Sequence, residues 1–340
     1  KALIILMKAL SAFKQYLALS SKLYVKDFKT MQIAILGASS QIAKGLIKVF
    51  AKQGNHHLQL FVRDKLVLKK WIEDQGIEKN CSIYHFDEFT TNLKIDLIIN
   101  CVGVGDPGKL VRLGAAVLEI TKIFDDLALD YLFNNPDTKY IFFSSGAVYG
   151  NIFSKPADAN SQALVNLNFR SPADFYTLSK LYSEGKHRAL SDFNIVDLRV
   201  FSFISDDFDI NGDFLISQAV KAAINQISFT TNSSNIIRDF IGPEDLASLI
   251  EAIMQFPQIN GSFDCYSKKP IDKFSILDFL RSELNLRFVV DQTLDSGLNQ
   301  NSKESYYSLN YQAKNLGFKP IYNSLENIQK SIIQISNLNK

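Results

Sequence analysis

The chain has 340 residues, of which 46% are hydrophobic and 21% charged, and its formal net charge is +2. That composition can bury a sizeable core, so global disorder is excluded, and the length allows two domains or one elaborated α/β domain. The near-neutral charge gives no support for binding nucleic acid or a membrane surface through bulk electrostatics. The three cysteines are scattered and odd in number, which predicts a reducing, cytoplasmic setting. The four histidines lack metal-ligand spacing, so no metal site is expected.

Residues 1–30 are expected to form an N-terminal extension. Its apolar residues recur at steps of three and four, which is typical of one face of an amphipathic helix. Lys8 and Lys14 interrupt the apolar run well before the ~20 residues that a spanning helix needs, so no membrane span is expected. The alternative is that the segment lies upstream of a natural start at Met31.

A short β-rich run at residues 32–36 leads through a turn of small residues into a periodic apolar segment that ends at Gly54. A strand, a tight turn and a helix form the context in which helix amides bind the pyrophosphate of a dinucleotide. Here Gly37 would form the turn, Ser40 would allow close backbone approach, and Ala43 would pack the helix on the strand. Because only the first of the three usual glycines is present, an ordinary βα turn is the alternative. The candidate cofactor contacts are Gly37, Ser39, Ser40, Gln41 and Ile42.

The end of the second predicted strand, residues 58–62, bears on the choice of cofactor. Enzymes that prefer NAD commonly place a carboxylate at this strand end, whereas an arginine suits the 2′-phosphate of NADP. Val62 occupies the usual acidic position and Arg63 follows it. The sequence therefore favours NADP, with NAD as the alternative because Asp64 stands next to Arg63.

Further apolar strands are predicted at residues 82–86, 97–102 and 140–143, with a helical stripe over residues 117–132 before the last of them. Alternating strands and helices of this kind predict an α/β fold with a doubly wound parallel sheet.

The candidate catalytic residues are Ser145, Tyr176 and Lys180. Ser145 follows a predicted buried strand, and Tyr176 and Lys180 stand at i and i+4 on one helix face. An ammonium beside a phenol is expected to lower the phenol pKa and make the tyrosinate accessible as a base, while a serine hydroxyl orients the substrate oxygen. A lone YxxxK pattern is common by chance, but its position after the Gly37 turn and the Ser145 strand end favours a catalytic set.

In SSGAVYG (residues 144–150) and YTLSK (residues 176–180), the chain resembles the extended short-chain dehydrogenase/reductase family, over about residues 31–340. That family holds nucleotide-sugar epimerases, dehydratases and ketosugar reductases. The resemblance implies a Rossmann fold, and it gives Ser145, Tyr176 and Lys180 the family's Ser-Tyr-Lys roles, with Tyr176 and Lys180 also contacting the cofactor. Further cofactor contacts implied by the resemblance are Asp87, Cys101, Val102 and Gly103.

The distal half is similar to the same family. The segment RDFIGPEDLA (residues 238–247) matches a family segment whose arginine reaches the substrate diphosphate, so Arg238 is a candidate substrate ligand. The alternatives are a salt bridge with Asp239 or a contact joining two domains. Ser202 stands where the family often has a phosphate-binding asparagine. The acidic loop at residues 204–209 would repel a substrate diphosphate if its carboxylates faced the diphosphate; the alternative is that they face water.

The expected organisation is a Rossmann domain over residues 31–200, joined by about residues 235–258, with a smaller C-terminal α/β substrate domain from residues 201–234 and 259–340. The resemblance also implies a homodimer, which no patch of the sequence supports independently.

The predicted function is that of an NAD(P)-dependent nucleotide-sugar epimerase or ketoreductase, which transfers hydride at a sugar carbon with Tyr176 as the acid/base. The Asp-Glu pair that 4,6-dehydratases use is absent after Ser145, which disfavours a dehydratase. A non-catalytic NADP-binding sensor or scaffold on the same fold is the alternative. Turnover of any nucleotide sugar would distinguish the enzyme from this sensor or scaffold.

Overall fold

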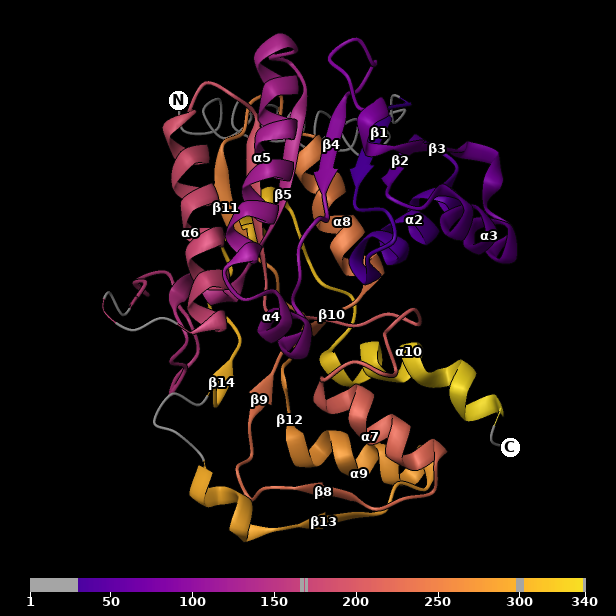
Figure 1. Cartoon of the computed structure of the whole chain (residues 1–340), viewed down its shortest axis with the longest axis vertical. Helices are drawn as coiled ribbons and strands as arrows, with labels where there is room; N and C mark the ends of the chain where they lie inside the picture. The colour runs from indigo at the N-terminus through magenta and orange to yellow at the C-terminus, as the bar shows by residue number, and fades with distance from the viewer. Residues whose placement is uncertain (1–29, 166–167, 169–170, 298–302, 339–340) are drawn as a thin grey trace, which may run out of the picture.

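The computed structural model describes residues 30–165, 168, 171–297 and 303–338 (Figure 1). The expected extension at residues 1–30 therefore lies outside the described residues, except for residue 30. Within them, no helix is both long enough and apolar enough to cross a membrane.

The centre of the molecule is a seven-stranded sheet in the order β11-β6-β5-β4-β1-β2-β3, in which every neighbouring pair is parallel. Strands β1, β4 and β5 are almost wholly buried because helices cover both faces. The predicted doubly wound fold is confirmed. The strands are β1 Gln32–Leu36, β2 His57–Val62, β3 Cys81–His85, β4 Leu97–Asn100, β5 Lys139–Ser145, β6 Ile195–Val200 and β11 Gly261–Asp264.

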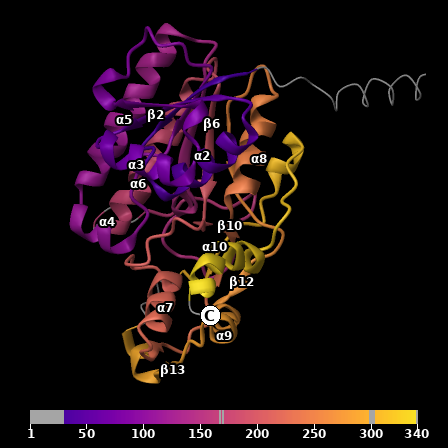
Figure 2. The ribbon, with the colours of Figure 1, turned by 90° about the vertical axis from the view of Figure 1, so that its right-hand side faces the viewer.

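Alternate side chains of the central strands feed two separate cores. Ile33 and Ile35 of β1 pack into the core beneath α2, α3 and α8, whereas Ala34 and Leu36 pack toward α5. Figures 1 and 2 show α5 and α6 together on one side of the sheet, with α2 and α8 on the other. The helices are α2 Gln41–Gln53, α3 Lys65–Gln75, α4 Pro107–Leu113, α5 Ala116–Asn134, α6 Pro172–Ala189 and α8 Pro243–Met254.

A smaller region with its own apolar core lies below the large sheet in Figure 1 and contains α7, α9 and α10. Its strands have only two or three residues each, so packing of the helices rather than a long ladder holds it together. Its elements are β8 Phe229–Thr231, β9 Ile237–Arg238, β12 Ile271–Asp272, β13 Phe288–Val290, β14 Ser305–Tyr306, α7 Leu215–Ile224, α9 Lys273–Leu284 and α10 Ser324–Leu338. The parallel pair β7 Ser202–Phe203 and β10 Phe240–Ile241 lies between this region and the sheet.

The expected domain division assigned residues 259–340 to the substrate domain. In the structure β11, which falls in this range, pairs with β6 at the edge of the large sheet. The polypeptide thus returns to the Rossmann sheet after residue 259. The rest of the division stays a prediction.

Candidate active site

The turn between β1 and α2 has the geometry of a phosphate-binding turn. Gly37 has a φ of +76°, and a Cβ there would lie 3.0 Å from the main-chain nitrogen of Val102. The hydroxyl of Ser40 caps α2 by accepting the amide of Ala43 at 3.3 Å, and Ala43 is fully buried. The first turn of α2 keeps amides without helical partners, which suits an anionic phosphate. The other predicted contacts in this turn are Ser39, Gln41 and Ile42, which are exposed or half-buried.

Gly37→Ala is expected to destabilise the fold by about 1–3 kcal/mol, because an L side chain is strained at positive φ and meets the β4 end. Cofactor affinity should fall with it. Denaturant unfolding and cofactor titration measure the two effects. Gly185→Ala is the control: it lies inside α6, where an added Cβ would meet nothing within 4 Å, and should be neutral or slightly stabilising. Equal stability of both variants would contradict this account of the turn.

The end of β4 brings the predicted cofactor contacts to the base of the catalytic helix. Cys101 is buried, and a Cβ on Gly103 would lie 3.5 Å from Lys180 Nζ. Burial raises the pKa of the Cys101 thiol, opposed by a hydrogen bond with Ser40 and by the charge of Lys180. The phosphate-binding turn, the β4 end and Lys180 therefore meet in one place.

Ser145, rather than its neighbour Ser144, has its hydroxyl in the candidate site. Ser145 ends β5, and its Oγ accepts the amide of Ala147 at 3.2 Å. Ser145 also lies close enough to Tyr176 to act against the rise in the pKa of that phenol. Ser144 instead donates to Glu184 Oε1 at 2.6 Å and is buried. This difference supports the choice of Ser145 made from the sequence.

Helix α6 carries both of the other candidate catalytic residues. A capping box between Ser171 and Asp174 fixes its first turn. Tyr176 and Lys180 lie one turn apart, as predicted, and Lys180 Nζ is 5.8 Å from the Tyr176 ring centroid. The Nζ also donates to the main-chain oxygen of Phe143 at 2.9 Å, which fixes the ammonium at the end of β5.

Burial dominates the protonation of this pair. It lowers the pKa of Lys180 to about 8. It also raises the pKa of Tyr176 above its usual value, against the opposing hydrogen bond from Ser145. The net shift is opposite to the lowering expected from Lys180, because desolvation of the phenolate outweighs the effect of Ser145. Tyr176 is protonated at neutral pH.

The charged groups at the ends of β2 and β3 have different partners. Asp64 caps α3, its carboxylate accepting the amides of Leu66 and Val67 at 3.1 Å each. Arg63 is exposed and makes no hydrogen bond or ion pair with the described residues. Asp87 is exposed and lies 2.6 Å from His85 Nδ1. Capping thus occupies the carboxylate that the sequence offered as an NAD ligand, and Arg63 is left free.

The predicted substrate residues lie on short strands between the two regions. Arg238 of β9 donates to the main-chain oxygens of Ile237 and Lys303 at 2.8 and 2.7 Å, and it makes no ion pair with Asp239. The bond to Lys303 links β9 to the chain just before β14, within the smaller region. Ser202 begins β7, whose partner strand β10 begins two residues after Arg238.

The acidic loop after β7 does not face water alone. Asp207 accepts the indole N–H of Trp71 at 2.9 Å and lies 2.5 Å from Lys48 Nζ. Asp206 lies 2.9 Å from the same Nζ. Farther along, Asp209 pairs with Lys109 at 3.1 Å. These contacts neutralise the loop against α2, α3 and α4, so its carboxylates do not oppose a bound diphosphate.

Sequence reasoning missed Tyr306, whose hydroxyl lies 3.1 Å from Ser145 Oγ. It also missed a network beside the site, in which Arg199 binds the carboxylate of Glu184 with two nitrogens and the hydroxyl of Tyr149. Tyr149 in turn donates to Asp264 at 3.0 Å. No local sequence signal marks these contacts, because their partners come from β6, α6, β11 and β14. The described residues contain no His, Cys, Asp and Glu cluster able to hold a metal ion.

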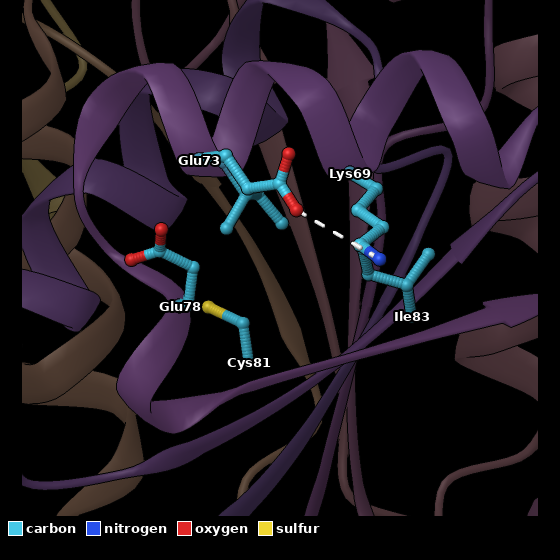
Figure 3. Close-up of a pocket in the computed structure, with 6 residues that line it drawn as sticks. Lys69, Glu73, Glu78, Cys81 and Ile83 are labelled. Atoms are coloured by element: carbon cyan, nitrogen blue, oxygen red, sulfur yellow. Dashed lines mark ion pairs between the residues drawn. The ribbon is translucent and has the colours of Figure 1, made fainter.

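A cavity of about 210 Å³ lies at the opposite end of the sheet (Figure 3). It opens between α3 and the edge strand β3, beside the exposed Lys69–Glu73 ion pair. Strands β4, β1 and β2 separate this edge from β5, where Ser145 lies. The cavity is therefore not part of the candidate active site. Its lining is Lys69, Ile72, Glu73, Glu78, Cys81 and Ile83.

Residues 33–266, well over half of the chain, match the family described as the NAD dependent epimerase/dehydratase family. The chain belongs to this family, and the predicted assignment as an NAD(P)-dependent enzyme of that kind is confirmed. No curated protein was found to match the sequence.

Among the solved structures to which the chain is similar is the UDP-glucose 4-epimerase of Thermotoga maritima with UDP-glucose, with a TM-score of 0.73 and 14% identity over 91% of this chain and 100% of that chain. The UDP-glucuronic acid 4-epimerase of Bacillus cereus, in complex with UDP-glucuronic acid and NAD, gives 0.71 and 16% over 91% and 100%. The dTDP-glucose 4,6-dehydratase of Bacillus anthracis, in complex with NAD, gives 0.71 and 13% over 91% and 97%. At these identities the likeness establishes the shared fold.

Proposed function

We propose that this protein transfers hydride between a nicotinamide cofactor and a carbon of a nucleotide sugar, as an epimerase or a ketoreductase. The observation that carries the proposal is the meeting of Tyr176, Ser145 and Lys180 with the β4 end and the glycine turn. A sensor or scaffold needs the cofactor turn but has no use for a phenol placed beside a serine and a lysine.

Each residue of the set has a distinct task. Tyr176, protonated at neutral pH, gives its phenolic proton to the sugar oxygen in the reducing direction and takes it back in the oxidising one. Ser145 donates a hydrogen bond that orients the reacting oxygen. Lys180, fixed by its bond to Phe143, lies where it can hold the nicotinamide ribose and place positive charge near the tyrosinate. When bound, the nicotinamide supplies the hydride acceptor or donor.

Arg63 supports NADP as the favoured cofactor, and NAD is the alternative. Its guanidinium is exposed at the end of β2 and free of described partners, while Asp64 is occupied by capping α3. Arg63→Ser is expected to weaken NADPH binding about 10-fold or more, by loss of a charge-assisted contact, and to leave NADH binding within about twofold. Fluorescence titration with both cofactors measures this. An equal effect on both cofactors would contradict the NADP assignment.

The test that separates epimerase from reductase uses the purified protein. After denaturation, the released nicotinamide is identified and counted. Near-stoichiometric NAD(H) would favour an epimerase that recycles its cofactor, and would overturn the Arg63 argument. An empty protein that binds NADPH more tightly than NADH would favour a reductase, and keto-sugars would then be screened.

Three further parts of the proposal rest on general grounds. Arg238 is proposed to face the substrate diphosphate with the nitrogens that do not bind main-chain oxygens, and Ser202 to lie beside it. Assembly as a homodimer and a cytoplasmic location also remain proposals. Sedimentation of the purified protein tests the homodimer, and localisation of the tagged full chain tests the cytoplasmic location.

A further inference from the structure

Ser145 has a second phenol as a partner, from a part of the chain that the catalytic motif does not include. The hydroxyl of Tyr306 lies 3.1 Å from Ser145 Oγ, across 161 residues of sequence. Tyr306 is buried, and its ring packs against Phe153 and Phe201 with centroid separations of 4.8 and 5.1 Å. The contact is therefore made inside an aromatic cluster beside the candidate catalytic serine.

The backbone on both sides of Tyr306 is held by hydrogen bonds. Strand β14, which contains Tyr306, pairs in parallel with β9. The amide of Ser305 donates to Phe153 at 2.8 Å, and the amide of Ala157 donates to Tyr307 at 2.9 Å. Because the backbone is bonded on both sides of Tyr306, this residue has a fixed position at the side of the site.

Counting protons at Ser145 shows what the direction of this contact decides. A serine hydroxyl has one proton and two acceptor lone pairs. Ser145 Oγ accepts the amide of Ala147, and either hydroxyl could donate in the bond between Ser145 and Tyr306. If Tyr306 donates, both lone pairs of Ser145 are used and its single proton is free to point at another acceptor. Burial raises the pKa of Tyr306, which keeps that phenol protonated and able to donate.

Two cations reinforce this donor. Lys303 Nζ lies 4.5 Å from the centroid of the Tyr306 ring, and Arg238 Cζ lies 5.8 Å from it. Neither cation forms an ion pair with a carboxylate of the described chain. Positive charge against a phenol ring draws electron density from its oxygen and strengthens O–H donation.

We propose that Tyr306 is a positioning residue: by donating to Ser145, it directs the Ser145 proton toward the oxygen of Tyr176 and, in the complex, toward the reacting oxygen of the sugar. The role in turnover rests on the proposed function, whereas the effect on Tyr176 does not. A donor chain of Tyr306, Ser145 and Tyr176 is cooperative, so each bond strengthens the next.

The first experiment measures the pKa of the phenol at position 176 in the absence of substrate. Difluorotyrosine, a more acidic phenol, is placed at position 176 alone by amber suppression in the full chain, and its ionisation is followed by ¹⁹F NMR. Tyr306→Phe is expected to raise the pKa at position 176 by ~0.3–1 unit, the effect of one hydrogen bond, with the fold retained. Tyr311→Phe, on the same C-terminal segment but packed against Tyr266, is the matched control and should leave it unchanged. An unchanged or lowered pKa in Tyr306→Phe would overturn the proposal.

The second experiment is a double-mutant cycle in kcat. Tyr306→Phe is expected to lower kcat about 2–10-fold with unaltered cofactor affinity, and to have no further effect in a Ser145→Ala background, because Tyr306 acts through Ser145. Equal losses in both backgrounds would show a role independent of Ser145 and contradict the assignment. A protein that turns over no nucleotide sugar would sink the proposed function, and the NMR titration would still decide the role of Tyr306.

Discussion

Replacing Tyr176 with phenylalanine is expected to lower turnover about 10²–10⁴-fold, the usual cost of losing a general acid–base. Ser145 acts against the rise in the pKa of this phenol, and Lys180 Nζ lies 5.8 Å from its ring centroid. No neighbouring group in the described site offers a proton in its place: Lys180 is committed to Phe143 and Tyr306 to Ser145. Cofactor affinity should stay within about twofold, because the change removes one oxygen and leaves the ring. Steady-state kinetics and cofactor titration measure the two effects.

Tyr182 provides the matched control for this substitution. It lies on the same helix, but its side chain is 55% exposed and it has no contact with the candidate site. Tyr182→Phe should retain nearly full turnover and stability. If Tyr176→Phe behaved like Tyr182→Phe, the acid/base assignment would be wrong.

Replacing His187 with leucine is expected to cost about 3 kcal/mol of unfolding free energy at neutral pH. The imidazole is fully buried between two carboxylates, with Nδ1 2.6 Å from Asp197 and Nε2 2.8 Å from Asp125. Both ring nitrogens therefore carry protons. Although burial alone would lower it, these hydrogen bonds raise the pKa of His187 to about 9. Leucine would leave two buried carboxylates facing each other, with Lys186 and the hydroxyl of Tyr140 on Asp125 and Arg188 on Asp197.

The stabilisation that His187 provides is expected to change with pH. The pKa of His187 is higher in the folded than in the unfolded protein, so its stabilisation is complete below about pH 6.5 and is lost as the pH rises through about 9. Lys180 works in the opposite direction, because burial lowers its pKa to about 8 and stability is regained as it deprotonates. Lys180 is present in both proteins, so most of its contribution cancels in the difference between their free energies of unfolding.

Denaturant unfolding at about pH 6.5 and about pH 9.5 measures the effect. The difference in the free energy of unfolding between wild type and His187→Leu should be smaller at the higher pH. His57→Leu is the control, since among the described residues the ring of His57 bonds the neutral Ser82, and its loss should cost about 1 kcal/mol. A difference between wild type and His187→Leu that grows with pH would contradict a protonated His187.

The features that the sequence predicted well are those with a local physical signal. The strands at residues 32–36 and 97–100 are continuous apolar runs, which only a doubly covered sheet can bury. Tyr176 and Lys180 could be paired because a helix fixes the geometry of i and i+4 neighbours. Gly37 was identifiable because its turn needs a positive φ.

The features that could not be predicted depend on distant parts of the chain. Tyr306 reaches Ser145 through β14, a strand of two residues with no periodic pattern of its own. The partners of Asp206 and Asp207 come from α2 and α3, more than 130 residues earlier. The pKa of Tyr176 depends on burial by the whole assembled site, so the i and i+4 spacing alone gave the wrong direction.

The most direct test of the central claim is the absorbance of the bound cofactor at the wavelength of reduced nicotinamide. Protein loaded with NADP⁺ or NAD⁺ is mixed with a panel of nucleotide sugars in a stopped-flow cell. Hydride transfer with Tyr176 taking the proton predicts a rise in absorbance for at least one sugar, and its loss in Tyr176→Phe. Tight cofactor binding with no absorbance change for any sugar would contradict the account and favour a cofactor-binding sensor or scaffold.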